Sequence, residues 1–149
     1  MKKGWLILYG ILMIAMSTVL VAYLSVLLAM QGVSLPWILA LPNGYAVKNA
    51  LVLIPGILLG GMIAWISHSL AVKKNNTFFY YAGPIVIILV VAAVALALYG
   101  GACGYCKAVV CSPKPVSECG IKTKLSITLF EIYCKCSTGS LPMWQALGL

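Results

Sequence analysis

Three long stretches without a charged residue constrain how this chain can fold more than any other feature. They cover residues 5–30, 50–72 and about 80–101. A helix over the first stretch would be about 39 Å long at about 1.5 Å per residue, whereas the hydrocarbon core of a bilayer is about 30 Å thick. Each stretch is long enough to cross a membrane, so the sequence predicts three transmembrane helices.

The composition excludes an ordinary water-soluble domain. Hydrophobic residues make up 63% of the 149 residues, charged residues make up 8%, and the mean hydropathy is +1.08. A soluble domain of this length cannot bury so much apolar surface. The formal net charge is +8, but the lysines are spread thinly, whereas a nucleic-acid interface gathers them on one face. We expect a lipid bilayer as the surroundings and no nucleic-acid partner.

The cysteines divide the chain into two regions. All six lie after residue 102, and small extracytoplasmic domains use an even number of clustered cysteines when their apolar core is inadequate. We therefore expect a membrane domain over residues 1–101 and a Cys-rich domain over residues 102–149. The predicted fold is an all-α transmembrane bundle of three helices with a small, β-containing, disulfide-stapled C-terminal domain.

Two other segments have patterns of their own. Apolar and polar residues alternate within residues 122–135, which predicts a strand with Cys134 and Cys136 on the same face. Residues 31–49 are rich in turn-forming residues, and their apolar part is too short to cross a bilayer. We expect a loop there that lies along the membrane interface, with Trp37 at headgroup depth.

The positions of the lysines indicate the orientation of the chain in the membrane. Lys2, Lys3, Lys73 and Lys74 flank the spans on one side, which the positive-inside rule assigns to the cytoplasm. Lys48 and five lysines after residue 102 lie on the other side, so raw counting favours the reverse orientation. The N-terminal anchor usually dominates, and clustered cysteines favour an oxidising compartment. We therefore expect a retained signal anchor, a cytoplasmic N-terminus and an extracytoplasmic C-terminal domain.

Small residues recur at four-residue steps in the second and third spans. The second span contains a GxxxG pair followed by an alanine, and the third contains a pair of alanines. Such stripes allow two helix backbones to approach closely in lipid. The expected helix-packing residues are Gly56, Gly60, Ala64, Ala93 and Ala97.

A C-x-x-C motif, Cys103-Gly104-Tyr105-Cys106, lies where the third span ends. In thiol–disulfide exchange one thiolate of such a pair attacks a substrate disulfide and the second resolves the mixed disulfide. The placement resembles that in membrane proteins that pass electrons from a cysteine pair to a quinone, which use a four-helix bundle. The alternative function is therefore a membrane thiol–disulfide oxidoreductase with Cys103 and Cys106 as its catalytic pair.

The cysteines have two other interpretations. Four thiolates could hold a structural zinc ion, although the single spacer of the second pair departs from the usual spacing of ligands; these residues are Cys103, Cys106, Cys134 and Cys136. In the interpretation that we favour, all six cysteines are structural half-cystines, in pairs that the sequence does not assign. They are Cys103, Cys106, Cys111, Cys119, Cys134 and Cys136. We expect no metal site and no cofactor.

Most enzymatic and transport chemistry has no candidate residues. Pumps and ion-coupled transporters place ionisable groups inside the membrane, but the spans contain no Asp, Glu, Lys or Arg, and we expect His68 near the end of the second span to be solvated or hydrogen-bonded locally. Glu118 and Glu131 are the only carboxylates, and no Ser-His-acid set or nucleotide-binding loop is present. The sequence therefore favours a non-enzymatic structural or accessory subunit of a larger membrane assembly, whose partners are other subunits or copies of itself.

Overall fold

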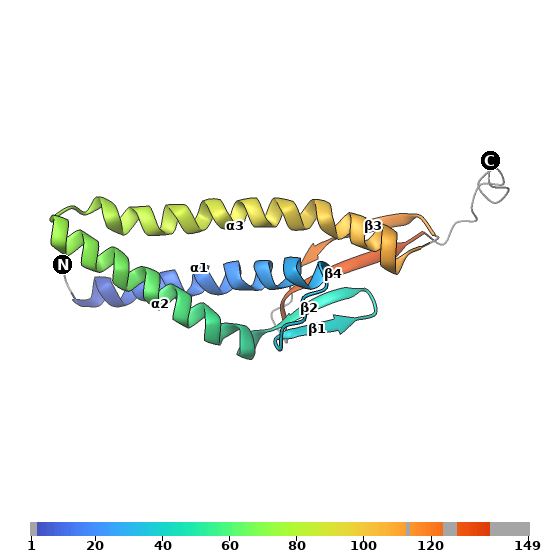
Figure 1. Cartoon of the computed structure of the whole chain (residues 1–149), viewed down its shortest axis with the longest axis horizontal. Coiled ribbons are helices and arrows are strands. Elements are labelled where there is room, and N and C mark those ends of the chain that lie inside the picture. Colours follow the sequence, from blue (N-terminus) through green and yellow to red (C-terminus); the bar gives the residue numbers. More distant parts are fainter. Residues whose placement is uncertain (1–2, 113, 124–127, 138–149) are drawn as a thin grey trace.

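Three long helices dominate the structure (Figure 1). They are α1 (Lys3–Met30), α2 (Asn49–Lys74) and α3 (Phe78–Tyr105), and all three are long and apolar enough to cross a membrane. The prediction of three apolar helices is confirmed. The computed structural model describes residues 3–112, 114–123 and 128–137.

The two ends of the helix bundle differ. The start of α1 and the tight turn between α2 and α3 lie together at one end, and a small sheet lies at the other (Figure 1). In the turn, Asn75 adopts the left-handed backbone conformation with φ 47°, which asparagine tolerates better than most residues. The backbone N–H of Asn76 donates to the carbonyl of Ala71 at 3.1 Å. The chain therefore reverses within three residues.

The third helix does not stop where the predicted span ends. It continues past residue 101 to Tyr105 and then through a π-helical turn, η1 (Cys106–Val110). The backbone N–H of Cys111 donates to the carbonyl of Cys106 at 2.7 Å, which closes this turn. The helix therefore crosses the expected domain boundary between residues 101 and 102 without a break and runs on beside the sheet.

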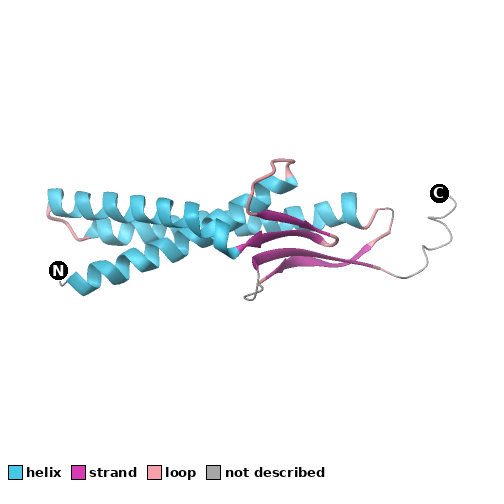
Figure 2. Cartoon of the chain, turned by 90° about the horizontal axis from the view of Figure 1, so that it is seen from below, coloured by secondary structure: helices cyan, strands magenta, loops and turns pink. Residues whose placement is uncertain are grey.

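The sheet contains strands from two distant parts of the chain. They are β1 (Ile38–Leu41), β2 (Gly44–Lys48), β3 (Val116–Lys122) and β4 (Thr128–Cys136), all antiparallel, in the order β1-β2-β4-β3. Figure 2 shows this sheet alongside one end of the helices only. The hairpin that connects α1 to α2 and the hairpin that follows η1 thus form one unit.

The prediction for residues 31–49 was wrong over residues 38–48, which form a hairpin instead of an irregular loop. Its tight turn holds Gly44 at φ 146°, and a side chain there would meet the backbone carbonyl of Ile132 in β4. A glycine is therefore required where β2 approaches β4. The strand predicted over residues 122–135 is confirmed from Thr128 onward, where β4 (Thr128–Cys136) lies. Its start was wrong, because Lys122 is the last residue of β3 and Thr123 lies in no strand; residues 124–127 lie outside the described residues.

Two apolar clusters hold the elements together. The larger lies under the sheet, where Leu98 and Ala102 of α3 meet Val47 of β2 and Ile132 of β4, all almost fully buried. The smaller lies at the opposite end and includes Tyr9, Met13, Ala71, Tyr80 and Ile87. The sheet is consequently packed on the helices by burial of apolar surface, the main favourable term in folding.

Trp37, expected at headgroup depth, joins the first hairpin to α1. Its indole N–H donates to the hydroxyl oxygen of Ser25 at 2.6 Å, and that hydroxyl donates to the carbonyl of Val21 at 2.6 Å.

Trp37→Phe removes the hydrogen bond from the indole to Ser25 and leaves the bond from Ser25 to Val21 intact. We expect it to lower the free energy of unfolding by about 1 kcal/mol, measured by urea unfolding in mild detergent. Trp65→Phe is the control because Trp65 is 69% exposed; equal losses for the two variants would contradict this prediction.

Candidate functional site

The glycine stripe of α2 lies directly against α1. A Cβ atom on Gly60 would lie 2.6 Å from Cα and 2.8 Å from the backbone nitrogen of Ile14, and a Cβ atom on Gly56 would meet the side chain and Cα of Thr18. Ala64, one step further along, is half-buried against the smaller apolar cluster. The close approach of α1 and α2 therefore depends on the absence of side chains at these two glycines.

A second stripe of small residues, on α3, is open. Ala93 and Ala97 are exposed, and so are Gly100 and Gly104, which the helical repeat places on the same face. A Cβ atom on either glycine would meet nothing within 4 Å in the described part of the chain. The sequence prediction included only the two alanines; the glycines continue the same spacing past the point where we expected the span to end. We call these four residues the α3 stripe.

Large apolar side chains flank the α3 stripe and are exposed as well. Val86 is 58% exposed, Leu89 is 64% exposed and Leu96 is 76% exposed. Over an 18-residue apolar window of each helix, 17% is buried inside the chain for the third helix, 22% for α2 and 39% for α1. The third helix therefore presents a wide apolar face, with a shallow strip of small residues along it, that no described part of this chain covers.

Three disulfides tie the end of the third helix to the sheet. Cys103 is bonded to a cysteine of β3, and Cys106 to a cysteine of β4. Cys111, just after η1, is also bonded to a cysteine of β4. Cys134 and Cys136 reach the two ends of the π-helical turn, as expected for side chains on the same face of a strand. The pairs are Cys103–Cys119, Cys106–Cys134 and Cys111–Cys136.

The C-x-x-C cysteines are not bonded to each other. Cys103 is joined to β3 and Cys106 to β4, so the motif forms two separate links instead of one exchangeable pair. The four sulfurs that a zinc site would use, those of the C-x-x-C pair and of Cys134 and Cys136, all take part in disulfides. In this state they are not available as thiolates for a metal ion or for thiol exchange.

The two carboxylates lie on the sheet. The hydroxyl of Tyr133 donates to Oε1 of Glu118 at 3.4 Å, and Nζ of Lys122 lies 4.0 Å from the centre of the Tyr133 ring. Desolvation, followed by the charge of Glu118 and this hydrogen bond, raises the pKa of Tyr133 above its usual value of 10.0. Glu131 pairs across the ladder with Lys122. Glu118 and Glu131 therefore lie on adjacent strands with different neighbours.

At the opposite end, His68 meets the side chain of a tyrosine. Its Nδ1 lies 2.7 Å from the hydroxyl of Tyr80, and the Tyr80 ring packs edge-on against the rings of Trp5 and Tyr9. His68 was expected to be solvated or hydrogen-bonded locally; its partner is a side chain on the next helix. His68 and Tyr80 border a pocket of 340 Å³.

No protein-family model, curated protein or solved structure matches this chain.

Proposed function

We propose that this chain is a non-enzymatic integral membrane protein that serves as a structural or accessory subunit of a larger membrane assembly. The observation that carries this proposal is the contrast between its two stripes of small residues. The stripe on α2 is covered by α1, whereas the α3 stripe is open in the described part of the chain. The open stripe is the surface on which another membrane helix would pack.

Glycine on a helix face lowers the stability of the helix, and close packing of another helix backbone offsets that loss. A face that meets only lipid gains nothing from glycine, which destabilises a helix interior by about 0.5–1 kcal/mol relative to alanine. A helix–helix contact in lipid, by contrast, depends on close approach, because lipid tails offer no hydrophobic driving force between helices. Gly100 and Gly104 continue the spacing of Ala93 and Ala97 and would let a neighbouring helix approach the α3 stripe closely.

The orientation that we propose follows from the two ends of the molecule. Lys3, Lys73 and Lys74 lie at the end that holds the start of α1 and the α2–α3 turn, which supports a cytoplasmic position for that end. The three disulfides lie at the sheet end, which supports an oxidising, extracytoplasmic compartment. The sheet would then present its outer surface to partners outside the cell membrane.

The oligomeric state tests this proposal. We expect the chain, extracted in mild detergent, to migrate as part of a complex, and we expect the double substitution Ala93→Ile with Ala97→Ile to release it as a monomer. Both alanines are exposed, so the substitution fills the stripe without disturbing the packing inside the chain. The measurement is the mass of the protein in detergent by native mass spectrometry.

The control for this test is Ala15→Ile, which adds the same side chain to an exposed position of α1. This variant should leave the complex intact. A wild-type chain that is monomeric in mild detergent, or a complex that both variants disrupt equally, would contradict the proposal.

A further inference from the structure

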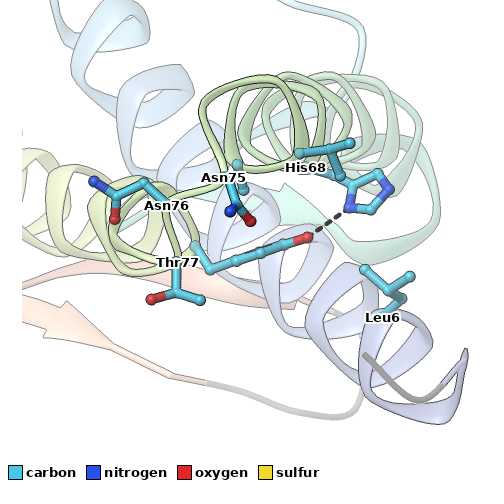
Figure 3. Close-up of a pocket in the computed structure, with 8 residues that line it drawn as sticks. Leu6, His68, Asn75, Asn76 and Thr77 are labelled. Carbon is cyan, nitrogen blue, oxygen red and sulfur yellow. Dashed lines mark hydrogen bonds between the residues drawn. The ribbon is translucent and has the colours of Figure 1, made fainter.

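The pocket at the α2–α3 turn is lined by residues of all three helices and of the turn (Figure 3). Its polar lining comes from the turn, with Asn75, Asn76 and Thr77, and from His68 and Tyr80. The remaining lining residues are apolar and come from α1 and the last turns of α2; they are Leu6, Ala71 and Val72. The pocket is thus amphipathic.

The charge around the pocket is of one sign. Lys73 and Lys74 form the last turn of α2, immediately before the turn that lines the pocket, and Lys3 begins α1 at the same end of the molecule. The first carboxylate in the sequence is Glu118, which lies on the sheet at the opposite end. No negative side chain therefore offsets these lysines, so an anion is the ligand that the local charge favours.

The size of the helices places the pocket at a specific depth. A helix of 26 residues, the length of α2, spans about 39 Å, whereas the hydrocarbon core of a bilayer is about 30 Å thick and the polar headgroup layers add about 5–8 Å on each side. The turn would then lie among lipid headgroups, close to the boundary with the acyl chains. A pocket there that has both polar and apolar lining residues suits a phospholipid, which carries a polar headgroup on apolar chains.

We propose that this pocket binds the phosphate-bearing headgroup of an anionic phospholipid. Lys73 and Lys74 adjoin the pocket without lining it, and Nζ of Lys74 lies 5.8 Å from the centre of the Phe79 ring; their flexible side chains supply the positive charge beside the site. The amide of Asn75 and the hydroxyl of Thr77 supply uncharged hydrogen-bond donors, and the apolar lining contacts the start of the acyl chains. The His68 ring, held by Tyr80 at 2.7 Å, forms part of the lining. This inference rests on the proposed membrane location but not on assembly through the α3 stripe.

Lipid binding to the full-length chain in mild detergent tests the inference directly. We expect native mass spectrometry to show one molecule of phosphatidylglycerol bound about tenfold more tightly than phosphatidylcholine, whose headgroup carries a positive group that the lysines repel. The double substitution Lys73→Gln with Lys74→Gln should weaken phosphatidylglycerol binding by at least about tenfold, since it removes two positive charges that attract the anionic headgroup.

A second variant and a matched control separate the pocket from general charge effects. Asn75→Gly removes the side-chain amide, and glycine accepts the left-handed backbone of this position, so the fold is retained while phosphatidylglycerol binding weakens. Lys107→Gln with Lys135→Gln makes the same change of charge at exposed residues of the sheet end and should leave binding unchanged. The mass of each intact variant also shows whether its three disulfides have formed.

Three results would overturn the inference. The first is equal affinity for phosphatidylglycerol and phosphatidylcholine. The second is an equal loss of binding in the pocket variants and in the sheet-end control. The third is displacement of phosphatidylglycerol by inorganic phosphate at concentrations comparable to those of the lipid, which would identify a soluble phosphate compound as the ligand. None of these results depends on whether the chain forms a complex, so failure here is distinguishable from failure of the proposed function.

Discussion

Replacing Cys106 and Cys134 together with alanine is expected to lower the free energy of unfolding of the sheet end by about 3 to 4 kcal/mol. This disulfide joins residues 28 positions apart, and a cross-link stabilises a fold mainly by restricting the unfolded chain, more so for longer loops. Its two cysteines are also 0% and 7% exposed, so their truncation leaves a cavity. Urea unfolding in mild detergent, with amide hydrogen exchange of β2 and β4, measures the loss.

The matched variant is Cys103→Ala with Cys119→Ala. This pair is separated by 16 positions and is only half-buried, so we expect a smaller loss of stability. Unchanged stability without the Cys106–Cys134 bond would argue against a structural role. Rapid exchange of Cys103 and Cys106 with an added dithiol, while the other cysteines stay bonded, would instead favour the oxidoreductase alternative.

The second large effect is expected at Gly60. Gly60→Ala should lower the free energy of unfolding by about 1–3 kcal/mol, because the added Cβ atom would lie 2.6 Å from Cα of Ile14. The obstructing atoms belong to the backbone of α1, so no side-chain rotation relieves the contact and the two helices must separate. Urea unfolding in mild detergent, and chemical shifts of the α1 amides, report the change.

The adjacent residue provides a control with the same substitution in the same helix. A Cβ atom on Gly61 would meet nothing within 4 Å among the described residues, so Gly61→Ala should leave the stability unchanged or raise it by up to about 1 kcal/mol through helix propensity. If Gly60→Ala were as harmless as Gly61→Ala, close packing of α1 on α2 would not be what holds these helices together.

The helices were the part of the fold that the sequence predicted best, because uninterrupted apolar composition over 5–30, 50–72 and 80–101 leaves few alternatives. The third helix runs beyond the apolar stretch, to Tyr105 and then through η1, since the C-x-x-C segment carries no helix stop signal. The expected domain boundary between residues 101 and 102 was placed where the composition changes. The helix continues through that point and carries the cysteines that are bonded to the sheet.

The hairpin over residues 38–48 was not predicted, because its first strand, Ile38–Leu41, is entirely apolar and shows no alternation. The signal that indicates it is the Asn43-Gly44 pair between two apolar runs. The hairpin's pairing partner, β4, lies far along the chain, so the stabilising contacts are not local. The disulfide pairs could not be assigned for a related reason, because which cysteines meet depends on how the end of the third helix lies against β3 and β4. Sequence spacing alone drew attention to the C-x-x-C pair.

The small-residue stripes show what spacing can and cannot reveal. Gly56 and Gly60 and the pair Ala93 and Ala97 have the same four-residue step, but only the structure distinguishes the stripe that α1 covers from the one that stays open. Likewise, His68 and Tyr80 are brought together by the α2–α3 turn, and neither residue alone indicated a pocket.

Site-specific photo-cross-linking in native membranes tests most directly whether another protein packs on the open face of the third helix. A photoreactive residue replaces Leu96, which borders the α3 stripe and is 76% exposed, or Leu58 on α2, which is 68% exposed and faces away from α1. We predict that position 96 forms a protein adduct of discrete mass, with another subunit or a second copy of this chain, whereas position 58 labels only lipid. Lipid adducts alone at both positions would contradict the account.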